Sequence, residues 1–244
     1  MSNREVEEQF PGQGDERRGG GLEALVRQRP PPLATVVEER IREAIVFGDL
    51  GLGEPISEER IATSLGTSRT PVREALAALQ LQGLVVIRPQ RGSFVFSPTP
   101  SEVAELCDFR AMLEVEALRL AHARGRETTL HAMRNAEMVM EVAEDSGDYR
   151  AAAEADAAFH GAFFDNSGNR FLIRAYGLIA GRVGAMRHFA RRHSATSKRE
   201  TAGEHRALIT AFADADPGTA EAILRAHVTA VNERYHEAAA DSED

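Results

Sequence analysis

Four side chains in the second half of the sequence are of the types that bind divalent metal ions. Asp156 and His160 lie four residues apart, and His205 and His227 follow in two later segments. Each lies on an apolar stripe with a spacing of about three to four residues, which is typical of the inward face of a helix. We therefore expect one carboxylate and three imidazoles, carried by three helices, to meet inside a helical bundle.

A divalent metal ion would satisfy these four groups together. Left unpaired, each buried polar group would cost on the order of 1–3 kcal/mol. One aspartate and three histidines suit zinc, with nickel and manganese as alternatives, and leave positions open for water or a ligand. The competing interpretation is that each histidine is a core residue satisfied by protein partners. The other histidines follow no such pattern and are expected at the surface or at helix ends: His122, His131, His188, His193 and His236.

A cation interrupts another apolar stripe, in the segment 101–124. Arg110 stands between Leu106 and Leu113 at helical spacing. An ion pair with Glu114 or Glu116 would explain it structurally. Alternatively, its guanidinium group could pair with the carboxylate of a small organic acid, which would make Arg110 an effector-binding residue.

A third group of side chains could contact DNA. The formal net charge of the chain is −9, yet residues 60–97 contain five arginines and a single acidic residue, Glu74. Arg69 and Arg73 are four residues apart with Thr70 beside them, on the side of a predicted helix that faces away from its apolar stripe. Such side chains can reach base edges and phosphates in the major groove. The competing interpretation is an ordinary solvated basic face.

The elements that would position these arginines follow from the surrounding pattern. Apolar spacing predicts a helix ending near Gly48, a second helix capped by Ser57, and a third capped by Ser68 and ended by Gly83. The segments 85–87 and 93–96 are expected to pair as a hairpin. Three helices followed by a hairpin make a winged helix-turn-helix. In that fold, Arg60 would approach the groove from the second helix, and Arg91 and Gly92 would form the tip of the wing.

The rest of the chain favours helices throughout, so the expected fold class is mainly α. We expect a mobile N-terminal tail (1–33), a winged helix-turn-helix domain (34–97), a short linker (98–100) and an all-helical domain (101–240). The helical domain should be a six-helix bundle, with helices at about 101–124, 127–145, 148–166, 169–193, 198–214 and 217–240.

Composition excludes several classes of protein. The longest stretch without a charged residue, 75–87, is far shorter than the roughly 20 residues that cross a membrane. The N-terminus lacks the apolar core of a secretory signal. Cys107 is the only cysteine, so neither an internal disulfide nor a cysteine-based zinc site can form. We expect a cytoplasmic protein with no membrane partner.

The segment from Ile56 to Leu76, ISEERIATSLGTSRTPVREAL, closely resembles the GntR family of bacterial transcription regulators. The helical remainder resembles the FCD effector domain of its FadR subgroup, so the resemblance covers about residues 33–240. It departs from the family at Glu54-Pro55-Ile56, where Pro-Gly is usual. By this resemblance the DNA-binding residues are Arg60, Ser68, Arg69, Thr70, Arg73, Arg91 and Gly92, and the metal ligands are Asp156, His160, His205 and His227.

The leading hypothesis is a ligand-responsive transcription regulator, a repressor with a metal-containing pocket for a small organic acid. It would bind a palindromic double-stranded DNA operator as a homodimer, and the dimer is implied by the resemblance alone. One alternative is a helical metalloenzyme in which the Asp/His3 site activates water. Another is a DNA-binding module whose helical domain only dimerises.

Overall fold

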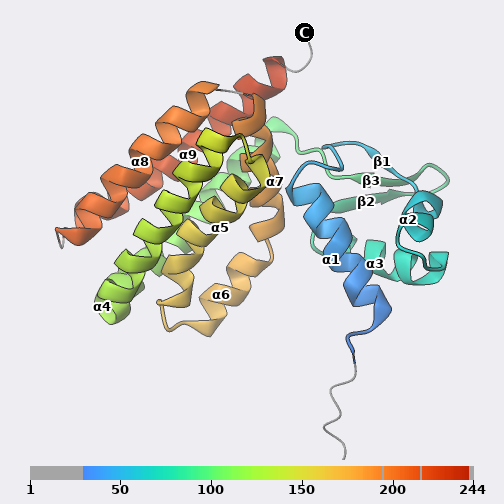
Figure 1. Cartoon of the computed structure of the whole chain (residues 1–244), viewed down its shortest axis with the longest axis horizontal. Helices are drawn as coiled ribbons and strands as arrows, with labels where there is room; N and C mark the ends of the chain where they lie inside the picture. The colour runs from blue at the N-terminus through green and yellow to red at the C-terminus, as the bar shows by residue number, and fades with distance from the viewer. Residues whose placement is uncertain (1–29, 194, 215, 242–244) are drawn as a thin grey trace, which may run out of the picture. The chain divides into compact units, whose positions relative to one another are not determined.

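The computed structural model describes residues 30–193, 195–214 and 216–241. The predicted mobile tail, residues 1–33, lies almost wholly outside the described residues. From Leu33 onward the chain forms one compact unit, and helices make up most of it (Figure 1). No helix in the described ranges is both long and apolar enough to cross a membrane.

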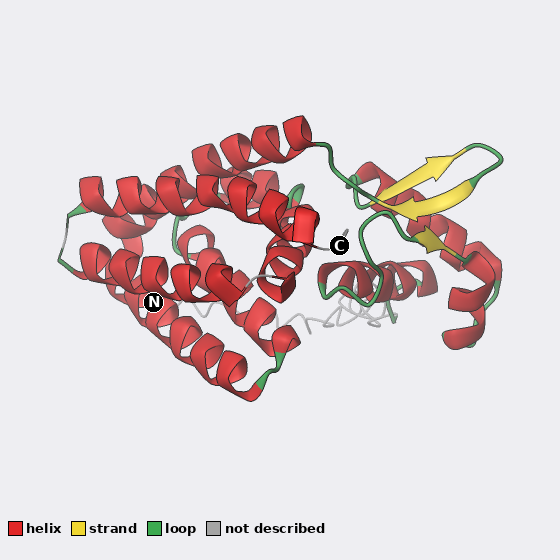
Figure 2. Cartoon of the chain, turned by 90° about the horizontal axis from the view of Figure 1, so that it is seen from above, coloured by secondary structure: helices red, strands yellow, loops and turns green. Residues whose placement is uncertain are grey.

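The first part of this unit is a winged helix-turn-helix, as predicted. It contains α1 (Leu33–Val46), α2 (Glu58–Ser64) and α3 (Arg69–Leu81), followed by β2 (Val85–Arg88) and β3 (Gly92–Val95). The sequence missed β1 (Pro55–Ile56), which pairs antiparallel with β3 and gives the strand order β1-β3-β2 (Figure 2). Two residues are too few to show a period, so this strand depends on its pairing with β3.

Local signals explain where these helices begin and end. Ser57 caps α2, since its hydroxyl accepts a hydrogen bond from the backbone N–H of Arg60 at 3.2 Å. Ser68 stands at the N-cap of α3, but its side chain makes no capping hydrogen bond there. Gly83 follows α3 with φ +70°, a conformation that favours glycine. The interior of the domain is apolar, with Ile41 and Ile45 of α1 in the same buried cluster as Leu76 of α3.

The second part is all helical, as predicted, but one predicted helix is divided in two. Its helices are α4 (Pro100–Ser146), α5 (Tyr149–Asp165), α6 (Arg170–Gly177), α7 (Ala180–His193), α8 (Ala195–Ala213) and α9 (Pro217–Asp241). The expected break at Gly125 is present inside α4, where Gly125 has non-helical φ −149° and ψ 41° and joins two helical segments across a kink. The expected single helix 169–193 is instead divided into α6 and α7. The helices described here still carry six labels, because α4 includes both segments on either side of Gly125.

The core of the helical domain brings α4, α5, α8 and α9 together. Phe159 and Phe163 of α5 share a buried cluster with Phe212 of α8 and Leu224 of α9. A capping box starts α4, in which the Glu102 carboxylate accepts a hydrogen bond from the backbone N–H of Thr99 at 2.7 Å. The carboxylate and the three histidines of the predicted metal site lie on these packed helices.

Candidate functional site

Three of the four predicted metal ligands converge in the interior of the helical domain. His160 of α5, His205 of α8 and His227 of α9 each offer one ring nitrogen, and these nitrogens all lie within 4.8 Å of one another. The three side chains are buried. The Nε2 atoms of His160 and His227 are 3.3 Å apart. The helical spacing brings the three imidazole rings close together. Three imidazole nitrogens are a donor set that suits a divalent metal ion.

A separate carboxylate lies beside the Nδ1 atom of each histidine. Oxygens of Glu114, Glu137 and Glu204 are 2.7, 3.1 and 2.7 Å from Nδ1 of His160, His205 and His227, respectively. A carboxylate that accepts from Nδ1–H leaves Nε2 free as a metal ligand and fixes the orientation of the ring. Nε2 of His205 has no hydrogen-bond partner among the described residues, although it is buried. The chemistry of the cluster therefore fits a metal ion.

The protonation states also suit metal binding. Burial lowers the pKa of His160 well below its ordinary value, and the nearby Arg110 lowers it further. Burial lowers the pKa of His227 to about 4, although the hydrogen bond to Glu204 opposes this shift. Both imidazoles are therefore neutral at pH 7, which is the form that binds a metal ion.

The fourth predicted ligand, Asp156, lies next to the cluster but is held by arginines. Its Oδ1 is 3.9 Å from Nε2 of His205 and accepts a hydrogen bond from Arg191 at 2.9 Å. Its Oδ2 is 3.0 Å from Nη1 of Arg187. Burial would raise the pKa of Asp156, but these two guanidinium groups hold it well below its ordinary value. Asp156 is thus a buried, charged carboxylate shared between the histidine cluster and α7.

Arg110 forms an ion pair with Glu114, which was one of the two interpretations of its position in the sequence. Its Nε donates to Glu114 at 2.6 Å, and its Nη2 lies 3.2 Å from Nε2 of His160. Both Arg110 and Glu114 are almost completely buried. Nη1 of Arg110 has no hydrogen-bond partner within the described ranges. Arg110 therefore contacts the histidine cluster, and Nη1 is the one nitrogen of its guanidinium group without a partner among the described residues.

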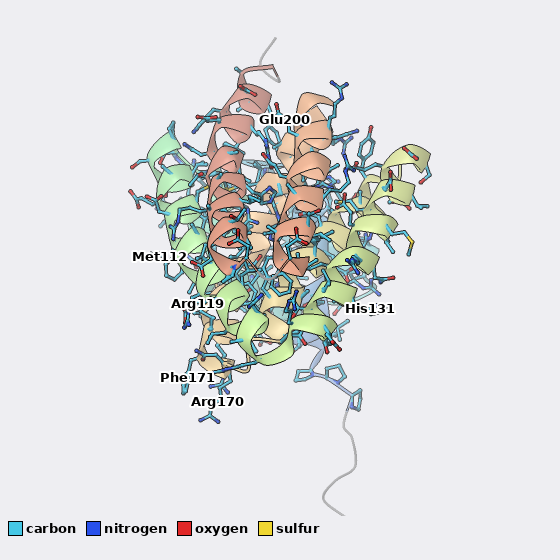
Figure 3. All side chains as sticks on the ribbon, turned by 90° about the vertical axis from the view of Figure 1, so that its left-hand side faces the viewer. Met112, Arg119, His131, Arg170, Phe171 and Glu200 are labelled. Carbon is cyan, nitrogen blue, oxygen red and sulfur yellow. The ribbon has the colours of Figure 1, made fainter. Side chains whose placement is uncertain are left out.

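Sequence reasoning missed the pairing of Glu114, Glu137 and Glu204 with the histidines, missed the arginines of α7, and misplaced one histidine. Glu114 and Glu137 are buried on α4, whereas Glu204 is half-buried on α8, and their partners depend on tertiary packing. His188 was expected at the surface, yet it is buried, because its helix packs against the end of α1: a Cβ atom added to Gly48 would lie 3.1 Å from the His188 ring. His131 of α4 is exposed as expected and is labelled in Figure 3.

The predicted DNA-binding residues lie on the exposed side of the winged domain. Arg69 and Arg73 on α3 are both exposed, as are Ser68 and Thr70. A single carboxylate oxygen of Glu58, on α2, accepts hydrogen bonds from both arginines. These hydrogen bonds, first that from Arg69, lower the pKa of Glu58. The two arginines are thus held side by side on the outer face of α3.

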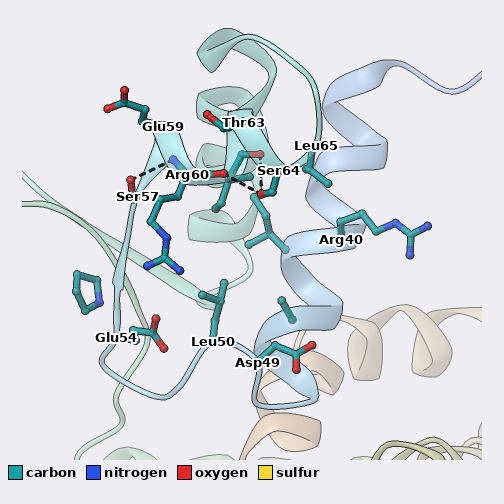
Figure 4. A pocket seen from close by; sticks show the side chains of 14 residues that line it. Arg40, Asp49, Leu50, Glu54, Ser57, Glu59, Arg60, Thr63, Ser64 and Leu65 are labelled. Atoms are coloured by element: carbon teal, nitrogen blue, oxygen red, sulfur yellow. Dashed lines mark hydrogen bonds between the residues drawn. The ribbon is translucent and has the colours of Figure 1, made fainter.

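The remaining predicted contacts are on α2 and on the wing. Arg91 and Gly92 are exposed at the β2–β3 turn, where Gly92 has φ +102° and therefore favours glycine. Figure 4 shows Arg60 extending from α2 on the side of Glu54 and Leu50, where a cavity of about 700 Å³ lies. Arg60 is exposed. Unlike Arg69 and Arg73, its side chain makes no hydrogen bond with Glu58 among the described residues.

Comparison with known proteins agrees with this two-part architecture. The family described as bacterial regulatory proteins, gntR family, matches residues 33–95, and the FCD domain matches residues 105–230. The "Probable D-xylose utilization operon transcriptional repressor" of Paenarthrobacter nicotinovorans is 34% identical over 200 residues, covering 80% of this chain and 87% of that protein. The Glc operon transcriptional activator of Escherichia coli (strain K12) is 27% identical, with 84% and 90% covered.

Solved structures share the fold. Escherichia coli McbR/YncC superposes with a TM-score of 0.73 at 21% identity, covering 85% of this chain and 99% of that chain. A GntR transcriptional regulator from Rhodococcus sp. RHA1 gives 0.71 at 22% identity, with 84% and 97% covered. The family and its named relatives are regulators, so the metalloenzyme interpretation is wrong. The chain belongs to the GntR family of bacterial transcription regulators and carries an FCD domain after its DNA-binding domain.

Proposed function

We propose that this regulator is a ligand-responsive repressor that binds a palindromic operator as a homodimer in the cytoplasm. The observation that carries the DNA-binding part is the exposed pair Arg69 and Arg73 on α3, held in place by Glu58. Two such helices related by a two-fold axis would read half-sites on successive turns of the major groove. The 34% identical relative is described as a repressor, which supports the direction of control.

The histidine cluster is proposed to bind a divalent metal ion, with zinc as the first candidate. His160, His205 and His227 would be ligands through Nε2, and Asp156 would be the fourth ligand after release from one of its arginines. A bound divalent ion would supply a Lewis-acid centre for an anionic oxygen of a ligand. Nickel and manganese are accommodated by the same donors.

A small organic acid is the proposed effector, because the helical domain buries cations with unused hydrogen-bond donors. Arg110 Nη1 and Arg187 Nε are two such donors among the described residues. A carboxylate would pair with either guanidinium group. The effector regulates only if it binds the DNA-competent and DNA-incompetent arrangements with different affinities.

Metal analysis combined with a mobility-shift assay tests the proposal. We expect about one equivalent of metal per chain in untagged protein, and a sequence-specific shift of a duplex selected for binding by this protein. If the protein binds this duplex but holds no metal, the proposed DNA binding is kept and the proposed metal site is overturned. A protein that shifts no specific duplex would overturn the proposed operator-binding role.

A further inference from the structure

Four glycines lie where α7 of the FCD domain packs on the winged domain. Gly181 and Gly184 belong to α7 and are three residues apart, which puts them on one face of the helix. Gly48 and Gly83 follow α1 and α3 of the winged domain, and both have positive φ, +75° and +70°. α7 lies beside α1 in Figure 1. At each glycine the backbone of one domain meets a side chain of the other.

The two glycines of α7 receive apolar side chains from the winged domain. A Cβ atom added to Gly181 would lie 2.9 Å from Cδ1 of Leu84, which is closer than a real Cβ atom approaches another heavy atom. A Cβ atom added to Gly184 would lie 3.2 Å from Cγ1 of Val46. Leu84 is only 1% exposed and belongs to the same apolar cluster as Val183 of α7, so it has little room to turn away. Any residue other than glycine at 181 must therefore displace Leu84.

The two glycines of the winged domain receive polar side chains from α7 in return. The guanidinium group of Arg182 lies against Gly83, where an added Cβ atom would be 3.3 Å from Cζ. The ring of His188 lies against Gly48, where an added Cβ atom would be 3.1 Å from Nε2. Gly83 stands two residues after the last residue of α3, so the first contact is at the end of the helix that carries the DNA-binding arginines. Side chains cross the boundary in both directions, which opposes sliding of one domain over the other.

α7 also holds the carboxylate that lies beside the histidine cluster. Arg187 and Arg191 both pair with Asp156, whose Oδ1 is 3.9 Å from Nε2 of His205. Arg187 directly precedes His188 in the sequence. The contacts with Asp156 and the contacts with the winged domain thus come from one rigid helix. A shift of α7 relative to α5 is therefore passed on to the winged domain.

We propose that α7 sets the direction in which α3 is presented to DNA, with Gly181 and Gly184 as the positioning residues of this joint. Gly181 allows Leu84, directly before β2, to pack on the backbone of α7. Leu84 ties the end of α3 to the sheet, since its N–H donates to the carbonyl of Leu79 at 3.0 Å and its carbonyl accepts from the N–H of Phe96 at 3.0 Å. A displaced Leu84 therefore tilts α3 relative to the FCD domain. In a homodimer this tilt fixes the distance between the two half-sites that are read, and in this one respect the inference rests on the proposed function.

Hydrogen exchange of the full chain tests the joint without DNA. Gly181→Ala should speed exchange of the Leu84 backbone amide at least tenfold, because the added methyl group displaces this residue. Gly184→Ala should speed exchange at the end of α1 by a smaller factor, because its added methyl group needs a smaller shift. Gly203→Ala is the matched control and should exchange like the wild type, since Gly203 is also helical but an added Cβ atom there would have no neighbour within 4 Å. Alanine favours the helix in all three variants, so faster exchange reports the contact and not helix propensity.

A double-mutant cycle assigns the effect to the contact between Gly181 and Leu84. Leu84→Val removes Cδ1, the atom that the added methyl group would overlap. Gly181→Ala should therefore change exchange at position 84 less than threefold in the Leu84→Val background, against at least tenfold in the wild-type background. Equal changes in the two backgrounds would overturn the assigned contact. Circular dichroism and thermal melting show which variants are folded.

Operator binding tests the positioning role itself. Gly181→Ala should weaken binding to the operator selected by the wild type at least tenfold, but binding to a duplex with a single half-site less than twofold. Operators whose spacer is one base pair longer or shorter should recover part of the lost affinity. Equal weakening on both duplexes would make Gly181 a purely structural residue and overturn the proposal, and so would a Gly181→Ala chain that exchanges and binds DNA like Gly203→Ala. If the wild type binds operator and single half-site equally, the proposed homodimer is wrong, and the exchange measurements alone decide whether the joint exists.

Discussion

Glu58 and Arg69 are joined by two hydrogen bonds to one oxygen: Oε2 of Glu58 accepts from Nε of Arg69 at 3.2 Å and from Nη2 at 2.8 Å. The same oxygen accepts from Nε of Arg73 at 2.8 Å. A carboxylate on α2 therefore aligns the two arginines of α3 before DNA arrives. Base edges and phosphates must compete with this carboxylate for the arginine donors.

Removing either arginine should weaken operator binding. We expect Arg69→Ala or Arg73→Ala to cost about 1–3 kcal/mol in affinity for the operator, because each removes a charged donor from the outer face of α3. Both variants should have the same oligomeric state as the wild type in light scattering. Wild-type affinity of both variants in a mobility-shift assay would exclude these residues from the interface.

Removing the charge of Glu58 should have the opposite effect on unrelated DNA. In Glu58→Gln the two arginines lose a local anion, so affinity for a non-specific duplex should rise by about three- to tenfold at low salt. The preference for operator over unrelated DNA should fall because the arginines are no longer aligned. Glu59→Gln is the control, since this exposed neighbour makes no hydrogen bond or ion pair with either arginine among the described residues. Fluorescence anisotropy against salt concentration measures both effects, and equal behaviour of the two variants would contradict the alignment role.

The metal site predicts a change in both composition and stability. Untagged protein should hold about one zinc per chain, and His205→Ala or His227→Ala should lose it. Because the ion would link α5, α8 and α9, chelation at neutral pH should lower the melting temperature. His131→Ala should behave like the wild type, since this histidine is exposed on α4. Less than about a tenth of an equivalent of metal in the wild type would count against the site.

Acidification should destabilise the metal-free protein between pH 6.5 and pH 4. The folded-state pKa of His227 is lowered by burial to about 4, from an ordinary value of 6.5. In this interval the unfolded chain binds a proton that the folded chain does not, so the free energy of unfolding falls as the pH falls, by about 3 kcal/mol from this group. The hydrogen-bonded Glu204, whose pKa is lowered to about 2, adds a loss only below about pH 4.5. Urea unfolding at pH 7 and pH 4.5 should therefore show a smaller difference for His227→Gln than for the wild type. An equal difference would contradict the assigned shift.

Helical periodicity predicted the elements well wherever a long apolar stripe faces one core. The stripes of α5, α8 and α9 placed His160, His205 and His227 on inward faces, and all three are buried as expected. The break predicted at Gly125 is also present, since Gly125 leaves helical dihedral angles inside α4, whereas the division of 169–193 into α6 and α7 was not predicted.

The partners of the histidines could not be predicted for a different reason. Glu114 and Glu137 lie on α4, and their pairing with His160 and His205 depends on how α4 packs against α5 and α8. The same holds for Arg187, which pairs with Asp156 from α7. The sequence had predicted α7 only as part of a longer helix, 169–193. Spacing along one helix fixes which face a residue occupies. It does not fix which side chain of another helix stands opposite.

The most direct test of the proposed repressor is selection of bound duplexes from a random double-stranded library with the wild-type protein. We expect an inverted repeat whose half-sites are about one helical turn apart, because two α3 helices related by a two-fold axis would read it. The same selection with the Arg69→Ala, Arg73→Ala double variant should yield no enriched sequence. Enrichment of a repeat by the double variant equal to that of the wild type, or no enriched sequence with the wild type, would contradict operator reading by Arg69 and Arg73 of two paired α3 helices.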